Sequence, residues 1–231
     1  MGSSLLDYYA ERANEYELIY RKPERQSDLA RLARELQASL AGQDVLELAC
    51  GTGYWTRLYA PAAASVLATD LSPEVLDLAR RKHYPANRVR FAVADAYQAD
   101  HIPGRFTAVF AGFWWSHVPR ERLAGFLAGL HHRFPSGARV VFCDNRFVEG
   151  SSTPVTRRDS NGNTYQSRQL NGGAEYEVLK NFPPREEIGQ TLHSAGAAEI
   201  RITELTFYWC VSYLTGNTAP STRGDLCDRS P

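Results

Sequence analysis

Short blocks of apolar residues recur along the chain, and longer stretches with helical spacing of apolar positions separate them. Such blocks are typical of strands that are buried on both faces of a parallel sheet. The alternation of strands with helices predicts an α/β fold. The predicted strands lie within residues 45–48, 66–69, 89–93, 106–113 and 138–144, followed by an adjacent pair in residues 199–206 and 207–214.

The helical stretches carry recognisable start and stop signals. Pro23 precedes a stripe of leucines at positions 29, 32, 36 and 40, and Gly42 follows it. Proline suits the first turn of a helix and glycine suits its end. Ser72 and Pro73 have the residue types of an N-cap and first position for the helix after the second strand. These signals predict helices that cover the sheet.

Residues 145–183 break this rhythm and are rich in Asn, Gly, Ser and Arg. A connection of this length inside a compact domain is usually functional or disordered. Strand-like runs in residues 163–170 and 174–179 flank the turn signal at residues 171–173, which predicts an ordered hairpin. We interpret the segment as a substrate cover, and plain surface decoration is the alternative.

Residues 44–56 combine a buried strand, a glycine turn and the start of a helix. Gly51 and Gly53 allow a sharp turn and a close approach of backbone amides to a ligand. The helix that follows directs free N–H groups to the same place, so a ligand is expected at the carboxyl end of this strand. A dinucleotide fingerprint requires a third glycine, but Thr56 occupies that position, which disfavours a pyrophosphate.

The run Glu47-Leu48-Ala49-Cys50-Gly51-Thr52-Gly53-Tyr54-Trp55-Thr56 resembles the first motif of the class I S-adenosylmethionine-dependent methyltransferases. The run Asp70-Leu71-Ser72-Pro73 and the pair Asp95-Ala96 strengthen the resemblance, which covers about residues 40–215. It implies a Rossmann-like, seven-stranded and mostly parallel sheet in the order 3-2-1-4-5-7-6, with helices on both faces. It also implies S-adenosylmethionine as the cofactor.

Asp70 ends the second strand, where a carboxylate can accept hydrogen bonds from both hydroxyls of a ribose. Capping of the next helix is the alternative role. The resemblance places Asp95 by the adenine, and it implies an N-terminal aromatic cover for the cofactor, although plain packing of that helical face is equally expected. The predicted cofactor residues are Tyr9, Tyr16, Glu47, Gly51, Gly53, Asp70, Leu71, Asp95 and Ala96.

The acceptor would lie beside the loop that follows the fourth strand. Aromatic faces there can attract a sulfonium or a cationic substrate. The predicted substrate contacts are Phe113, Trp114, Trp115 and, from the inserted segment, Tyr176.

His117 is the candidate base, because histidine titrates near neutral pH. Packing or capping is the alternative for this residue. Tyr165 and Arg146 are further catalytic candidates that would orient the substrate, and an arginine suits a carboxylate or phosphate group.

The chain has 231 residues, with 26 basic and 26 acidic side chains. This balance argues against a general nucleic-acid or membrane-surface binder. We expect a cytoplasmic protein without a transmembrane span, and the wide spacing of its four cysteines predicts no metal site. The expected division is a helical cover in residues 1–40, a methyltransferase domain in residues 41–214 and a disordered tail in residues 215–231.

The expected activity is transfer of a methyl group to oxygen or nitrogen of a small metabolite, with no nucleic-acid partner and an open oligomeric state. Protein methylation is the first alternative, and a non-catalytic partner protein with the same fold is another. A nicotinamide-dependent reductase is a weaker alternative, which rests on the spacing of Tyr176 and Lys180. That motif belongs on a long helix, whereas glycines precede this stretch and Pro183 follows it.

Overall fold

The computed structural model of the chain describes residues 16–169 and 175–216. Three sequence-based predictions lie outside the described residues: the cofactor contact of Tyr9, the turn at residues 171–173 and the tail beyond residue 216. The predicted contact of Tyr16 concerns a side chain that is likewise not described, although its backbone begins the 3-10 helix η1 (Tyr16–Arg21).

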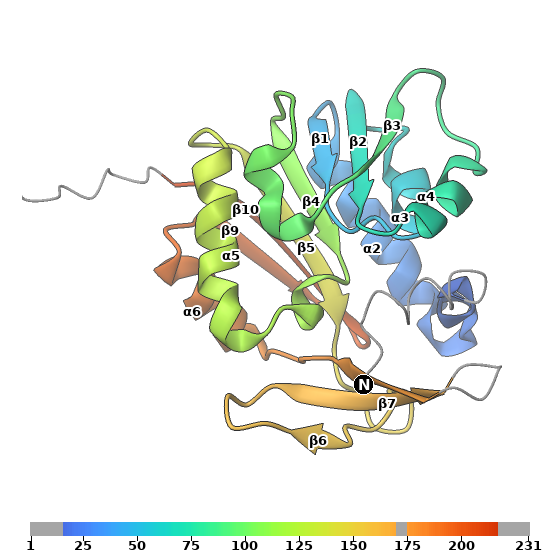
Figure 1. Cartoon of the computed structure of the whole chain (residues 1–231), viewed down its shortest axis with the longest axis vertical. Helices are drawn as coiled ribbons and strands as arrows, with labels where there is room; N and C mark the ends of the chain where they lie inside the picture. The colour runs from blue at the N-terminus through green and yellow to red at the C-terminus, as the bar shows by residue number, and fades with distance from the viewer. Residues whose placement is uncertain (1–15, 170–174, 217–231) are drawn as a thin grey trace, which may run out of the picture.

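The main sheet has seven strands in the order β3-β2-β1-β4-β5-β10-β9 (Figure 1). The first five strands run parallel, whereas β10 is antiparallel to both of its neighbours. Counted within this sheet alone, the order is 3-2-1-4-5-7-6, which confirms the predicted fold. The strands are β1 (Asp44–Glu47), β2 (Ser65–Asp70), β3 (Val89–Val93), β4 (Ala108–Gly112), β5 (Arg139–Asn145), β9 (Ala198–Glu204) and β10 (Tyr208–Leu214).

Helices α2 (Gln26–Leu40), α3 (Tyr54–Tyr59) and α4 (Pro73–Arg80) cover one face of the sheet. The short 3-10 helix η2 (Pro23–Arg25) contains Pro23, so the regular helix begins three residues after the predicted start. The leucines of the predicted stripe are all buried in α2. Ser72 caps α4 as expected, since its side chain accepts a hydrogen bond from the Val75 amide.

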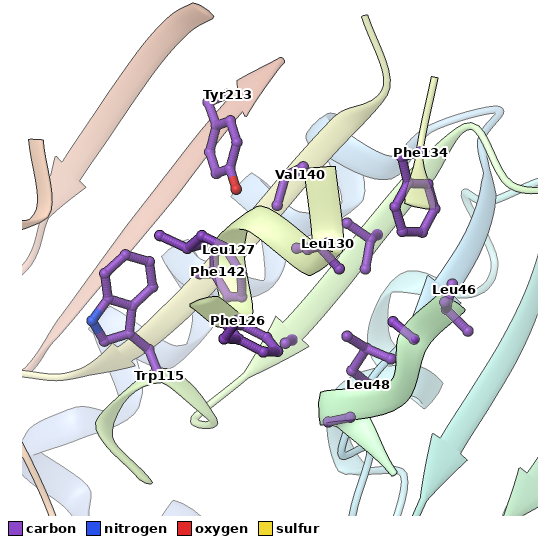
Figure 2. Packing of buried hydrophobic residues seen from close by; sticks show 14 of the residues in the cluster. Leu46, Leu48, Trp115, Phe126, Leu127, Leu130, Phe134, Val140, Phe142 and Tyr213 are labelled. Carbon is purple, nitrogen blue, oxygen red and sulfur yellow. The ribbon is translucent and has the colours of Figure 1, made fainter. Parts of the chain in front are cut away.

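Helices α5 (Arg120–Arg133) and α6 (Arg185–Ser194) and the 3-10 helix η3 (Ala96–His101) cover the other face. Figure 2 shows the core on this side, where Phe126 and Leu127 of α5 pack over Phe142 of β5. Trp115, in the 3-10 helix η4 (Trp115–His117), belongs to the same core. The sheet is therefore buried on both faces, as the apolar blocks in the sequence predict.

The inserted segment forms a second, antiparallel sheet of β6 (Arg157–Arg158), β7 (Thr164–Gln169) and β8 (Glu175–Leu179). It lies below the main sheet in Figure 1, on the side where the parallel strands end. Two hydrogen bonds join its end to η4: His117 Nδ1 donates to the Leu179 carbonyl at 2.7 Å, and the Asn181 amide donates to the Ser116 carbonyl at 2.8 Å. The predicted strand pair is thus present, and it closes one side of the sheet edge.

Within the described ranges, no helix has the length and apolar character to cross a membrane. The same residues contain no group of histidine, cysteine and acidic side chains that could hold a metal ion. Cys50, Cys143 and Cys210 are buried free thiols.

Candidate active site

The glycine turn after β1 depends on left-handed backbone conformations. Gly51 and Gly53 have φ values of 55° and 73°. A β-carbon on Gly53 would clash with the Tyr84 hydroxyl and would lie 3.1 Å from the Ala79 β-carbon, which is closer than an ordinary contact. Glycine is therefore required at position 53 both for its φ and for the approach of α4.

Asp70 holds this turn against the end of β2. Its Oδ2 accepts a hydrogen bond from the Gly51 amide at 2.8 Å, and its Oδ1 accepts one from the Ser72 amide at 3.0 Å. Burial raises the pKa of the Asp70 carboxyl, although these amide bonds act in the opposite direction. Because Ser72 itself caps α4, the carboxylate of Asp70 is not the helix cap.

A cavity, called here the cofactor cavity, opens at the carboxyl ends of the parallel strands. Its empty volume is about 1010 Å³, which includes the solvent space of its open mouth. The structure brings together most of the predicted residues that follow different strands. Those lining the cavity are Gly51, Asp70, Leu71, Asp95, Ala96, Phe113, Trp114 and His117.

One part of this cavity is an apolar slot. Leu71 keeps 42% of its surface exposed, which is unusual for a leucine beside a core, and it lines the slot with Ala96. Tyr97 completes the slot and meets Trp114 edge-to-face at 5.4 Å between ring centroids. The Asp95 carboxylate accepts a hydrogen bond from the Tyr97 amide and so orients the start of η3. The sequence analysis missed Tyr97, although it directly follows the Asp95-Ala96 pair.

Glu47 is not among the residues lining the cofactor cavity, contrary to the expected ligand contact. Its carboxyl lies beneath the glycine turn, where Oε2 accepts hydrogen bonds from Thr56 at 2.7 Å and Tyr59 at 2.8 Å. Complete burial raises the pKa of this carboxyl to about 8. At neutral pH the folded protein therefore holds Glu47 mainly in its protonated form.

This placement predicts a pH-dependent effect of Glu47→Gln on stability. The ordinary pKa of 4.5 applies in the unfolded chain and about 8 in the folded protein. Between these values only the unfolded state ionises, so the wild type loses stability as the pH rises, by roughly 5 kcal/mol in total. Glutamine does not titrate, so the stability of the variant relative to the wild type should rise through this window. Urea denaturation at several pH values measures it, and a pH-independent difference would refute the buried neutral carboxyl.

His117 lies at the wall of the cavity, and its environment opposes the role of a base. Because a carbonyl only accepts, the bond to Leu179 places the proton on Nδ1. Burial, with the nearby positive charge of Lys180, lowers the pKa of the imidazole to about 3. A group of such low basicity is a poor proton acceptor at neutral pH. The packing alternative from the sequence analysis describes this residue better.

The structure does not bring Trp115 to the cavity, contrary to the prediction. Its indole lies in the core seen in Figure 2, edge-to-face with Phe142 at 5.2 Å and with Trp209 at 5.7 Å. Only Trp114 of the tryptophan pair lines the cavity. Trp114 packs against the edge of that core and still lines the cavity, whereas Trp115 is buried within it, a difference that the sequence alone cannot reveal.

Arg146 and Tyr165 also lie away from the cofactor cavity. Arg146 donates to the Leu205 carbonyl at 2.5 Å and pairs with Glu204 at 3.4 Å, so its charge supports the turn between β9 and β10. The Tyr165 hydroxyl donates to Asp159 at 3.0 Å, and its ring lies under the Arg157 guanidinium. Both predicted catalytic roles are therefore corrected to structural contacts away from the cofactor cavity.

Tyr176 is buried in β8, opposite Arg168 of β7, and it does not line the cavity as predicted for a substrate contact. Lys180 follows the same strand, and its Nζ donates to Ser116 at 2.7 Å and pairs with Asp144 at 3.1 Å. The reductase alternative needed Tyr176 and Lys180 on one helix. Their placement on and after a strand removes its structural basis.

Comparisons with known proteins agree with this geometry. A family model described as a methyltransferase domain matches residues 45–137. The demethylmenaquinone methyltransferase of Clavibacter sepedonicus is 29% identical over 188 residues, which are 73% of this chain and 71% of that protein. The enzyme of the same name from Staphylococcus aureus (strain JH9) is 24% identical over 201 residues, 80% of each chain. The solved structure of DhpI in complex with SAH has a TM-score of 0.73 and 29% identity, covering 91% of this chain and 95% of that chain.

The chain belongs to the class I S-adenosylmethionine-dependent methyltransferases. This methyltransferase has the glycine turn, the aspartate after β2 and the Asp95-Ala96 pair after β3 on one cavity. These are the positions at which the sequence resembles the family. The chain is thus an enzyme of the transferase class.

Proposed function

We propose that this methyltransferase moves a methyl group from S-adenosylmethionine to oxygen or nitrogen of a small metabolite. The observation that carries the proposal is the cofactor cavity, in which Asp70 and the glycine turn adjoin an apolar slot. A second, open cavity shares Phe113 with it. The small sheet of the inserted segment contributes to the wall of that space, which supports its role as a substrate cover.

The residues of the cavity suit the parts of the cofactor. Asp70 presents a buried carboxylate for the ribose hydroxyls, as acidic residues at this position do in related folds. Leu71, Ala96 and Tyr97 offer apolar surfaces to a purine, and Asp95 offers an acceptor at the edge of the slot. The side chain of Trp114 lines the cavity, and its buried indole N–H has no hydrogen-bond partner among the described residues.

We propose that residues 1–40 cover the cofactor, with Tyr9 and Tyr16 as the contacts. Gly53 acts indirectly, by allowing the turn that positions the Gly51 amide.

A bound sulfonium cofactor supplies an activated methyl group, and the protein's task is to position the acceptor and exclude water. Phe113 and Trp114 form an aromatic wall on the acceptor side of the cavity. Since His117 is neutral and weakly basic, this wall contains no strong base among the described residues. The arrangement therefore suits an acceptor that reaches the site already deprotonated.

The pH profile of catalysis tests this assignment of His117. We expect no inflection from His117 in kcat between about pH 5 and 8, because its pKa in the folded protein is about 3. His117→Asn should retain the shape of the profile, since asparagine can still donate to the Leu179 carbonyl. A kcat profile of the wild type that rises near pH 6.5 and becomes flat in the variant would restore His117 as the base.

Calorimetric titration tests the proposed function directly. We expect saturable binding of S-adenosylmethionine and S-adenosylhomocysteine, and no binding of NADH. Binding of NADH with no binding of the other two ligands would overturn the proposal. If the protein binds S-adenosylmethionine, small acceptors are then screened for formation of a methylated product.

A further inference from the structure

A second cavity, called here the acceptor cavity, adjoins the cofactor cavity, and Phe113 lines both. It encloses about 1140 Å³ of empty volume including its open mouth. Its walls come from the ends of β4 and β5, from the η1–η2 region and from β7 of the small sheet. The acceptor cavity therefore lies where a molecule could approach the cofactor cavity from the carboxyl end of the sheet.

Phe113 forms the boundary between the two cavities and is held firmly. Its φ of 60° is in the left-handed region, which is costly for a residue with a large side chain. Its ring stacks on Trp55 at 5.6 Å and meets Tyr20 edge-to-face at 5.9 Å. The backbone conformation of Phe113 is thus stabilised by the packing of its ring against Trp55 and Tyr20, which also contact each other.

Four cationic side chains from three separate segments line the acceptor cavity: Lys22, Arg25, Arg168 and Lys180. Within the described residues, its lining contains no acidic side chain. The chain as a whole has no net charge, so this concentration of positive charge is local. Cationic clefts with low-dielectric walls raise the local concentration of anions.

Acidic groups near the acceptor cavity offset only part of this charge. Asp144 pairs with Lys180 from outside the lining, and Glu24 bonds to the Ser151 hydroxyl at the rim. Lys22 and Arg25 also contact Ser151, through its carbonyl and hydroxyl oxygens, which are neutral. Such bonds position the two cations without cancelling their charge.

Arg168 is a lining cation with a buried N–H that has no acceptor among the described residues. One of its terminal nitrogens donates to Gln166 at 2.6 Å. Its Nε is buried and has no hydrogen-bond partner among the described residues. A buried N–H of a guanidinium without an acceptor is costly, and an oxyanion is the acceptor that guanidinium geometry fits best. Arg168 is also close enough to lower the pKa of His117, so its charge reaches the boundary of the cofactor cavity.

We propose that the methyl acceptor is a small molecule with a carboxylate or phosphoryl oxyanion, bound in the acceptor cavity by Arg168 and methylated on an oxygen of that anion. This inference rests on the proposed function and names its substrate class. An oxygen lone pair of the anion forms the new O–CH₃ bond as the S–CH₃ bond breaks, and the breaking bond's electron pair stays on sulfur. No proton moves, so the reaction needs no base, in agreement with the neutral His117.

Binding of simple anions to the protein saturated with S-adenosylhomocysteine tests the proposal. The probes are inorganic phosphate and acetate, with acetamide as the neutral match for acetate, each titrated calorimetrically. We expect saturable binding of at least one anion and none of acetamide. Binding of phosphate alone identifies a phosphoryl acceptor, and binding of acetate alone identifies a carboxylate acceptor. Formation of methyl esters from small acids, but not ethers or methylamines from matched alcohols and amines, is the second readout.

Arg168→Gln should weaken anion binding about 10- to 100-fold, the usual effect of losing a charge-assisted bond. Its affinity for S-adenosylhomocysteine should be unchanged, which also shows that the variant is folded. Arg168→Lys should recover part of the loss. The matched control is Arg158→Gln, because Arg158 is an exposed arginine of the same small sheet that does not line the acceptor cavity.

The results separate failure of the proposed acceptor class from failure of the proposed function. If S-adenosylhomocysteine binds but neither anion binds, or if anion binding is the same in Arg168→Gln, the proposed acceptor class is wrong and the proposed function stands. Methylation of neutral alcohols or amines in preference to acids has the same meaning. If S-adenosylhomocysteine does not bind the wild type, the proposed function and the acceptor class both fail.

Discussion

Asp70→Ala should lower the affinity for S-adenosylmethionine at least about 100-fold, because two charge-assisted hydrogen bonds to a ribose contribute roughly 1.5–3 kcal/mol each. Asp70 is well placed for this role. One oxygen accepts from the Gly51 amide and the other from the Ser72 amide, so the carboxylate is held rigidly at the cofactor cavity. Each oxygen retains a further lone pair for a ligand hydroxyl.

Calorimetry with S-adenosylmethionine measures the effect, and circular dichroism checks that Asp70→Ala is folded. Asp77→Ala is the matched control, since Asp77 is an exposed aspartate in the next helix and pairs only with Arg80 among the described interactions. Asp70→Asn separates charge from shape, because an amide oxygen can still accept from one backbone N–H. Unchanged affinity in a folded Asp70→Ala protein would disprove the ribose contact.

Lys180→Met should destabilise the protein by about 3–5 kcal/mol, the cost of leaving a buried charge without its partner. The side chains of Lys180 and Asp144 are 6% and 0% exposed. Burial opposes the ionised form of Asp144, but Lys180, aided by backbone amides, holds its pKa below the ordinary range. Without the lysine, the carboxylate would face the low-dielectric interior alone.

The double variant Lys180→Met with Asp144→Asn should lose much less stability, since no charge is then buried and an amide oxygen can still accept from the Ser116 amide. The control is Arg80→Met, which breaks the exposed pair with Asp77 and should cost less than about 0.5 kcal/mol. Urea denaturation of the four proteins gives the values. Equal losses in the single and double variants would show that the Lys180–Asp144 pair does not determine the stability here.

The strands and most residues that line the cofactor cavity could be predicted because their signals are local. The apolar run of β1, the left-handed glycines and Asp70 lie within short stretches, and parallel strands bring their carboxyl ends to one edge. Each such residue therefore reaches the cofactor cavity from its own strand. The predicted contacts of Trp115 and Glu47 were wrong for different reasons. Trp115 is buried although its neighbour Trp114 lines the cavity, and Glu47 is buried in the layer beneath the glycine turn.

The acceptor cavity could not be read in this way, since its cations come from distant segments. Lys22 and Arg25 donate hydrogen bonds to Ser151, which is more than a hundred residues away in the sequence, and no local pattern predicts that contact. One signal was present in β7, where strand alternation places Gln166 and Arg168 on the same face. Without the packing of the small sheet, however, that face could not be assigned to the cavity, and Arg146 was the arginine chosen instead.

The attachment of the small sheet to η4 has a consequence for ligand recognition. His117 and Asn181 provide hydrogen bonds at this junction, and the buried Lys180 joins Ser116 to Asp144 there. With these hydrogen bonds in place, this wall forms when the protein folds and needs no rearrangement when a ligand binds. Little conformational entropy is then lost when a ligand binds at this wall. We therefore expect selectivity to depend on the shape of the ligand, and association to be fast because no rearrangement precedes it.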